Sequence, residues 1–562
     1  MYIPTELSPL GMGAFNSLQI PLTLTATQAN STIKLTKTGS PTVFGLSYRV
    51  NGGPWHAYTI DDVITLQNVG DYVQFWNTEE TLSTSGSNYV QYVMTGRVRA
   101  RGNIQSLFNY SDTVPAYGFY FLFGGCTALV TSPELPAKSI AQGCYMSMFE
   151  GCTSLEIAPN LPATSAANVC YYRMFVNCFS LINPPTIALT TVASTCCYYM
   201  FSNCTSLTTM PTLHATTMQP SCYYGMFSGC TALTNVSNLL ATTLANNCYQ
   251  SMFYGCTSLV NAPALPATTL SDNCYKGMFA HCISLTTAPD LPATSLANYC
   301  YYEMFRGCSL IDSVSVNFTD WSNTGATTDW LTGTAATGTF ICPDGLTIPS
   351  RDGSGVPENW DIVRKIQYLE STGTQYIDTL YSPNPNTLLE LTCCASPDYT
   401  YGGTFFDVLE AGETSSIRYQ FSANFGNSPN AAYGIYLWND KAYQYGGSPN
   451  SIYVTPGDKI RTVGTITFGR GYATAWGQTK NFNAETTRTF TRTLYLFSGM
   501  NINGAFTEGI KLRVYEFKIY DVGMKLTRDF IPVLDNNNVP CMYDCISEQL
   551  FYNQGSGTFN YA

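Results

Sequence analysis

Residues 248–273 read CYQSMFYGCTSLVNAPALPATTLSDN, and this stretch decides the fold because the chain carries eight related copies of it. One phenylalanine of each copy recurs at steps of 26 residues: Phe123, Phe149, Phe175, Phe201, Phe227, Phe253, Phe279 and Phe305. A cysteine lies three residues after each of them, from Cys126 to Cys308. Eight copies without slippage predict a solenoid of eight 26-residue rungs.

Three more columns share this period. The second cysteine column is Cys144, Cys170, Cys196, Cys222, Cys248, Cys274 and Cys300. Two aliphatic columns begin at Leu129 and Leu135. One rung alone cannot bury enough apolar surface to offset the ordering of its backbone, so rungs must stack. We expect CYxxMFxGC to form a short helical or turn segment and SLxxAPxLP to be extended, because its prolines suit a short strand with little central pairing.

The repeat resembles the BspA-like class of leucine-rich repeats, whose rungs carry Ala-Phe-x-x-Cys-x-x-Leu followed by Ile-Pro. The matching residues here are Met-Phe-x-x-Cys-x-x-Leu and Leu-Pro, over residues 118–345. A longer rung and the added cysteine column depart from the family pattern. The resemblance implies a leucine-rich-repeat-like solenoid, of a kind common in surface and adhesin proteins of gut Bacteroidales and in their crAss-like phages.

The sequence changes character on both sides of the repeat. Residues 21–117 alternate apolar and polar, as in STIKLTK and YVQYVMTG, and predict a small β-sandwich that also caps the solenoid. Residues 1–20 are expected to be an N-terminal arm, read either as a disordered tail or as a virion anchor. After Cys308 the pattern stops, and a closing cap leads into a linker at 346–361.

Residues 362–562 alternate throughout and contain no segment with a helical period. The opening KIQYLESTGTQYIDT and the closing RDFIPV and PCMYD resemble laminin-G or concanavalin A-like lectin domains. That resemblance implies a two-sheet jelly roll whose concave side or edge loops bind carbohydrate. The fold class predicted for the whole chain is therefore mainly β.

Composition narrows the functional classes. Hydrophobic residues make up 45% of the 562, which excludes a mostly disordered chain. A net charge of -11 argues against nucleic acid and against anionic membrane surfaces as partners. The N-terminal sequence has no basic segment followed by an apolar core, and no run of 18 apolar residues occurs, so we expect neither a secretory signal nor membrane insertion.

The 21 cysteines invite a metal or disulfide interpretation. Zinc needs ligand pairs that converge, whereas these cysteines recur one per column. We interpret the columns as small apolar core residues, with inter-rung disulfides and a metal site as the alternatives. Cys541 and Cys545 could also meet Cys393 and Cys394 at a metal. We expect no cofactor and no metal.

Catalysis finds little support in the sequence. His56, His214 and His281 form no nucleophilic triad pattern. Glycoside hydrolysis is the remaining enzymatic alternative and needs two carboxylates about 5–10 Å apart. The segment DVLEAGE offers only Asp407, Glu410 and Glu413 at a spacing of three, which places neighbours on opposite faces of a strand. We therefore expect a protein that is not an enzyme.

Aromatic residues are the candidate binding groups. The second residue after each cysteine of the second column varies in polarity, which indicates exposure, and includes tyrosines on three consecutive rungs. Tyrosine combines apolar area with a hydroxyl and suits sugars and protein hot spots. Packing along the solenoid flank is the alternative. The predicted binding residues are Tyr172, Tyr198, Tyr224, Tyr302, Trp438, Tyr443, Tyr445 and Trp476.

These features together favour a bacteriophage virion protein, a fibre or surface decoration that displays modules for host attachment. Its expected partners are a host-surface glycan or protein and, through the N-terminal arm, other virion proteins. A bacterial cell-surface adhesin is the first alternative and a glycoside hydrolase the second. No heptads enforce a trimer, so a homo-oligomer stays open.

Overall fold

The computed structural model describes residues 20–562 apart from 42, 44, 80–81, 385, 396–402, 411–416, 425–433, 439–451, 455–462, 470–471, 476–477, 482–492, 501–505 and 510. Two compact units divide the chain: one runs to Gly338 and resumes over Leu346–Trp360, and the other comprises Thr339–Gly345 and Asp361–Ala562. The helices among the described residues are the short 3-10 segments η2 (Ile104–Phe108), η3 (Thr324–Thr327) and η5 (Val522–Met524). The predicted mainly β class is confirmed.

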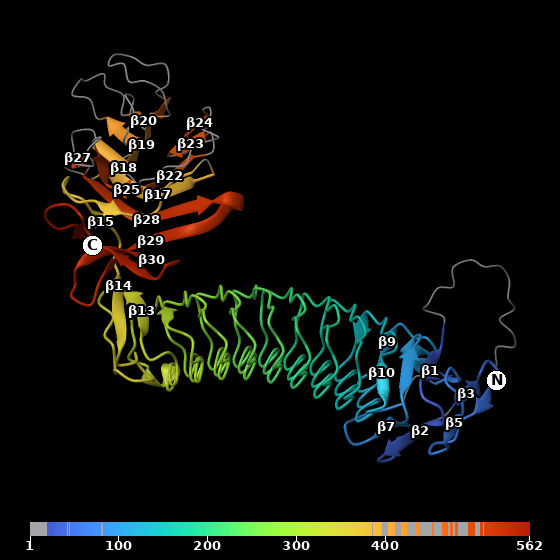
Figure 1. Ribbon diagram of the computed structural model, residues 1–562. Helices are drawn as coiled ribbons and strands as arrows, with labels where there is room; N and C mark the ends of the chain where they lie inside the picture. Colours follow the sequence, from blue (N-terminus) through green and yellow to red (C-terminus); the bar gives the residue numbers. More distant parts are fainter. Residues whose placement is uncertain are drawn as a thin grey trace. The chain divides into compact units, whose positions relative to one another are not determined.

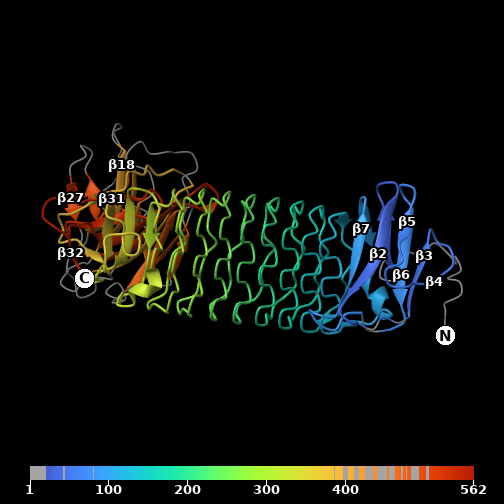
Figure 2. The same ribbon diagram turned by 90° about the horizontal axis from the view of Figure 1, so that it is seen from below.

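The N-terminal part of the first unit is a β-sandwich (Figure 2). One sheet has the order β10-β8-β1-β6-β3-β4 and the other β5-β2-β7. Along β2, alternate side chains are buried between the sheets, as the alternation in STIKLTK predicts. The strands are β1 (Leu22–Ala26), β2 (Ser31–Thr38), β3 (Leu46–Val50), β4 (His56–Ala57), β5 (Ile64–Leu66), β6 (Tyr72–Asn77), β7 (Tyr89–Thr95) and β8 (Val98–Arg101).

The sandwich covers the apolar end of the solenoid. Strand β8 pairs in parallel with β10 (Leu129–Thr131), which belongs to the first rung. The backbone N–H of Tyr92 donates to the carbonyl of Leu122 at 2.7 Å, and the Tyr92 ring stacks on Phe123 at 5.2 Å. Further on, β9 (Thr113–Val114) pairs in parallel with β11 (Ser139–Ile140). The sandwich therefore covers the apolar end of the first rung, as the terminal cap of a solenoid must.

The repeat region is a β-solenoid of about 10 turns spaced by ~26 residues, so it extends beyond the eight copies visible in the sequence (Figure 1). Between rungs, the extended segments pair mostly through single parallel bridges 26 residues apart, such as Thr131 with Ile157 and Leu161 with Ile187. The prolines beside these positions explain the sparse pairing, because proline has no N–H to donate.

The CYxxMFxGC segments are turns and not helices. Successive N–H groups alternate between two acceptors: Met148 donates to the carbonyl of Tyr145 three residues back, and Phe149 donates to Met174 on the next rung. Every fourth residue has a positive φ, 53° at Ser147 and 74° at Gly151 in one rung. This backbone alternates pairs of buried residues with residues that face outward. Of the two forms that the sequence left open, the turn is correct.

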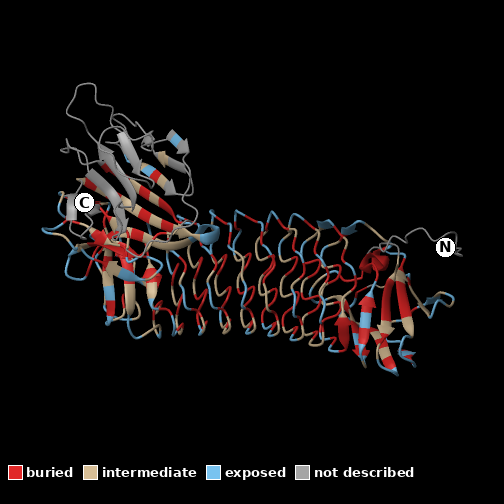
Figure 3. Cartoon of the chain, turned by 45° about the horizontal axis from the view of Figure 1, so that its top comes forward, coloured by how far each residue is buried: buried red, intermediate tan, exposed pale blue. Residues whose placement is uncertain are grey.

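Two columns form the inner spine of the solenoid. The phenylalanine rings stack from rung to rung, with centroids 5.4 Å apart for Phe175 and Phe201 and 5.5 Å apart for Phe201 and Phe227. From Cys152 onward, the thiol of each following cysteine donates to a phenylalanine carbonyl of the previous rung, as Cys204 does to Phe175 at 3.1 Å, and Cys126 donates to the Tyr92 carbonyl instead. All these cysteines are buried and free. Figure 3 shows that buried residues recur in every turn of the solenoid. The interpretation as core columns is therefore confirmed, with a thiol hydrogen bond added.

The far end of the solenoid is closed by residues that the sequence assigned to a cap and a linker. Phe305 donates its N–H to the carbonyl of Trp330, which continues the rung pattern for one more turn. Leu331 then donates to Gly353, and the Trp330 indole N–H donates to Gly355 at 2.8 Å. Residues 346–360 thus pack against the last turn, where we expected a linker. The short strand β12 (Ser313–Ser315) also belongs to the first unit.

The second unit is built of β-sheets. Its larger sheet has the path β13-β14-β29-β28-β17-β22-β23-β24, with β30 paired to β29, β31 to β30, and β15 to both β28 and β32. The other sheets have the orders β16-β25-β18-β19-β20-β21 and β26-β27. The strands of the larger sheet are β13 (Gly338–Pro343), β14 (Trp360–Lys365), β15 (Leu369–Glu370), β17 (Leu388–Ala395), β22 (Gly464–Gly469), β23 (Tyr472–Ala475), β24 (Gln478–Asn481), β28 (Leu512–Asp521), β29 (Lys525–Leu534), β30 (Pro540–Asp544), β31 (Gln549–Phe551) and β32 (Asn560–Tyr561). Those of the smaller sheets are β16 (Ile377–Asp378), β18 (Gly403–Glu410), β19 (Ile417–Asn424), β20 (Gly434–Trp438), β21 (Ile452–Val454), β25 (Tyr495–Leu496), β26 (Ser498–Met500) and β27 (Phe506–Gly509).

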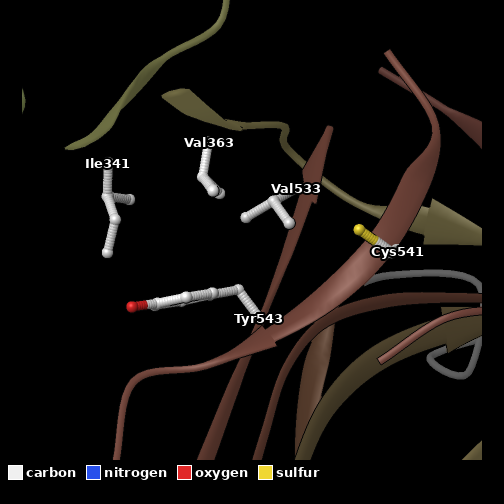
Figure 4. Packing of buried hydrophobic residues seen from close by; sticks show 5 residues of the cluster. All are labelled: Ile341, Val363, Val533, Cys541 and Tyr543. Atoms are coloured by element: carbon white, nitrogen blue, oxygen red, sulfur yellow. The ribbon is translucent and has the colours of Figure 1, made fainter. Parts of the chain in front are cut away.

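The closing motif of the sequence builds the core of this unit. Ile341, Val363, Val533, Cys541 and Tyr543 form one buried cluster contributed by β13, β14, β29 and β30 (Figure 4). Arg528 of RDFIPV and Asp544 of PCMYD form an ion pair on the same two strands, with 3.4 Å between Nε and Oδ2. Asp544 is fully buried. The distinctive motif thus has a structural explanation.

Candidate binding surface on the turn edge of the solenoid

The turn edge is the surface formed by the outward residues of the CYxxMFxGC segments together with the residue before each segment, from residues 117–126 onward at steps of 26. The alternating hydrogen bonds hold every turn segment against the next, so equivalent side chains lie directly above one another. In most rungs, buried cysteine, tyrosine, methionine and phenylalanine anchor the segment from inside. Side chains on this edge therefore stand on a rigid backbone, which lowers the entropic cost of binding.

The predicted tyrosines do form a ladder on this edge. The ring centroids of Tyr172 and Tyr198 are 5.0 Å apart with an interplanar angle of 4°, and those of Tyr198 and Tyr224 are 4.6 Å apart at 23°. All three side chains are half-buried. In contrast, Tyr171 and Tyr223 of the neighbouring column are fully inside the solenoid. Two consecutive tyrosines of one rung thus have opposite environments, one in the core and one at the surface.

The stacking decides which atoms of the ladder a ligand meets. Both faces of the Tyr198 ring are covered by its neighbours, so its edge and hydroxyl remain for a partner. Sugar stacking on a ring face, which the sequence suggested, is blocked at the middle of the ladder. What the ladder offers is a row of phenol groups, one per rung, each able to donate and accept a hydrogen bond.

Tyr199 is a member of this surface that the sequence reasoning missed. Its ring meets Tyr198 edge-on at 4.7 Å and Tyr224 at 5.4 Å. A Cβ on Gly225 would lie 2.3 Å from the Tyr199 ring, so glycine is required there for the ring to lie flat against the next rung. Burial raises the pKa of Tyr199 to about 12. The sequence does contain a signal for Tyr199. In this rung Cys197 replaces the tyrosine that is buried in other rungs, and the adjacent pair Tyr198 and Tyr199 follows it.

The first rungs extend the aromatic surface. Tyr120 occupies the ladder position on the first rung and was also missed, because Gly118 replaces the cysteine that marks the column. Its ring meets Tyr89 edge-on at 5.1 Å, and burial raises its pKa. Between Tyr120 and the ladder, the Arg173 guanidinium binds the Glu150 carboxylate through two hydrogen bonds of 2.6 and 3.2 Å. This end of the turn edge is aromatic, with its nearest charges paired.

The predicted residue Tyr302 lies apart from the ladder, near the closing end. The Lys276 ammonium sits 4.6 Å from the centroid of the Tyr302 ring and 5.9 Å from that of Tyr299. The two rings meet edge-on at 6.0 Å and form a corner around the ammonium. Tyr299 is 49% exposed. The structure therefore does not join Tyr302 to the other predicted tyrosines but gives it a cationic partner.

The remaining predicted residues belong to the second unit. Trp438 ends strand β20, and its side chain lies outside the described part of the structure. Tyr443, Tyr445 and Trp476 lie outside the described residues, as does Glu413 of the hydrolase alternative. Asp407 and Glu410 lie on β18, and their side chains are likewise not described.

Among the described residues, no group of three or more histidine, cysteine or acidic side chains is arranged to hold a metal. The cysteines that were considered as a metal site in the second unit do not meet. Cys393 lies on β17 and Cys541 on β30, and β28 and β29 separate these strands in the sheet. No helix within the described ranges is long and apolar enough to cross a membrane.

Fold and surface together define a class: a capped β-solenoid with an aromatic edge on rigid turns. Comparisons of the chain with models of known families, with curated proteins and with solved structures found no match.

Proposed function

We propose that this protein is a binding scaffold without catalytic activity, which attaches to a surface glycan through the turn edge of its solenoid. One observation carries most weight: the partly exposed ladder of Tyr172, Tyr198 and Tyr224 stands on a fixed backbone beside a charge pair that is already satisfied. A row of preorganised hydroxyl groups with little free charge suits a hydroxyl-rich polymer of low charge density that lies along the rungs.

Within this role, attachment of a bacteriophage virion to its host is the setting that we favour. The resemblance of the rungs to BspA-like repeats and of residues 362–562 to laminin-G or concanavalin A-like domains supports it, since such modules occur together in surface proteins of Bacteroidales and their phages. The buried free thiols agree with folding in a reducing compartment, where virions assemble. The chain would then be a fibre or surface decoration on the virion.

A bacterial cell-surface adhesin with the same modules is the second candidate, supported by the same resemblance. Purified virions distinguish the two settings, because the fibre role requires the chain in their proteome. Presence of the chain on intact bacteria that carry no phage would favour the adhesin instead.

The binding role is tested with a glycan array probed by the full chain and by Tyr198→Phe and Tyr198→Ala. The first variant keeps the ring stack and removes one hydroxyl, and the second removes both. We expect signal on at least one glycan class, weakened about tenfold or less by the first variant and more strongly by the second. Ile182→Ala is the matched control, because Ile182 is 50% exposed and lies outside the turn segments. Unchanged binding in both Tyr198 variants would refute the role of the ladder.

A further inference from the structure

Lys276 differs from the other cations of the turn edge in having no carboxylate partner. Arg173 is paired with Glu150, and Arg306 lies 2.5 Å from Glu303 and 3.5 Å from Asp329. Within the described residues, no carboxylate lies within 4.0 Å of the Lys276 ammonium. The chain as a whole has a net charge of -11 and repels anions. An ammonium without an acidic partner is therefore the group on this edge that attracts an anionic ligand.

The surroundings of Lys276 hold it in place for a ligand. The rings of Tyr299 and Tyr302 flank the ammonium, and a cation over aromatic rings is attracted by their negative faces. That contact restricts the flexible lysine side chain, so less entropy is lost when it binds. Gln250 holds the same rung position on the preceding turn and supplies an amide group to the same edge. The corner combines one cation and two phenol groups, with Gln250 at the equivalent position one rung earlier.

From this arrangement we infer that Lys276, Tyr299 and Tyr302 form a subsite for a carboxylate-bearing sugar of the glycan that the turn edge binds. The inference rests on the proposed glycan-binding function and specifies its ligand. The ammonium pairs with the sugar carboxylate, and the phenol and amide groups hydrogen-bond the ring hydroxyls.

The charges beside the subsite limit the charge density of the glycan that it binds. Glu303 and Asp329 outnumber Arg306, so the group beside the subsite carries one net negative charge. A polymer with an anion on every unit, such as a nucleic acid or a polyphosphate, is repelled there and needs clustered cations that this edge lacks. A glycan in which acidic sugars alternate with neutral ones fits the charge pattern, because a single carboxylate reaches Lys276.

The test uses the full chain and a hyaluronan oligosaccharide, in which glucuronic acid alternates with N-acetylglucosamine, titrated by calorimetry at low and high salt. Its carboxyl-reduced form is the neutral control. We expect the acidic form to bind more tightly and its advantage to shrink with salt. Lys276→Gln should weaken binding of the acidic form about tenfold, because a charge-assisted hydrogen bond is lost, and should leave the neutral form unaffected. Lys276→Arg should retain most of the affinity.

The matched charge control is Lys138→Gln, because Lys138 is exposed on the first rung away from the turn segments. Equal binding of both oligosaccharides, or no effect of Lys276→Gln, overturns the subsite while leaving glycan binding intact. Absence of binding to either form, together with an array without signal, refutes the proposed function as well. Tighter binding of a polyglutamate peptide than of hyaluronan assigns the corner to a protein partner and overturns the sugar assignment.

Discussion

Replacing Phe201 by alanine tests whether the stacked phenylalanines hold the solenoid together. Phe201 has no exposed surface and stacks on Phe175 at 5.4 Å and on Phe227 at 5.5 Å. Truncation of a fully buried phenylalanine to alanine costs about 3–5 kcal/mol, from lost burial and from the cavity left behind. Because each rung contacts only its neighbours, this loss falls on the middle of the solenoid and uncouples its two halves.

The assay is urea unfolding followed by far-ultraviolet circular dichroism and by tyrosine and tryptophan fluorescence. We expect Phe201→Ala to lower the transition midpoint and to broaden the transition. Phe179→Ala is a closely matched control, since Phe179 is 43% exposed and lies one rung away. It should cost less than about 1 kcal/mol. The reasoning would be refuted if Phe201→Ala cost no more than Phe179→Ala.

Further predictions concern thiols, alkaline pH and two single positions. Only Cys545 is exposed, so native protein should react with one equivalent of Ellman's reagent, and urea-unfolded protein should react at all 21 cysteines without reductant; a smaller count would indicate disulfides. Burial raises the pKa of Cys230 from 9.0 to about 12, so unfolded thiols release protons before folded ones, and the free energy of unfolding should fall as pH rises from 9 toward 12; urea midpoints that stay constant over this range would contradict it. Gly225→Ala should displace the Tyr199 ring and weaken glycan binding, whereas an unchanged affinity would remove Tyr199 from the binding surface. Asp544→Ala should destabilise the second unit by about 3–5 kcal/mol, because it removes the fully buried carboxylate that pairs with Arg528 and accepts hydrogen bonds from Ser547 and the Asp529 backbone; a loss below about 1 kcal/mol in urea melts would contradict the structural role.

The repeat was readable from the sequence because a fixed 26-residue period leaves few alternatives. Phe201 and Cys204 recur in every rung, and stacking rungs is the one way to bury all equivalents at once. The extra turn around Trp330 was not readable, since tryptophan and leucine replace the methionine and phenylalanine of the pattern. The turn form of CYxxMFxGC depends on positive φ at residues such as Ser147, and the signal is weak because that column has glycine only at Gly225 and Gly277.

The candidate surface was only partly predictable, for a similar reason. Variation of polarity within a column indicates exposure, and Tyr198 and its two neighbours in that column do lie partly exposed in one stack. Which part of a ring is accessible depends on stacking geometry, which the sequence does not encode locally. Tyr120 and Tyr199 escaped notice because each lies in a rung whose marker residue is substituted. The contact of Tyr302 with Lys276 was not predicted, although the two residues lie on adjacent rungs in the same column.

The location of binding is tested most directly by tyrosine footprinting of the full chain. Tetranitromethane nitration, read by mass spectrometry, is compared with and without the glycan that the array identifies. We predict that bound glycan lowers nitration of Tyr198, Tyr199 and Tyr224, while the buried Tyr171 stays unmodified in both states. Protection confined to residues 362–562, with unchanged nitration along the turn edge, would contradict the account and place binding in the second unit.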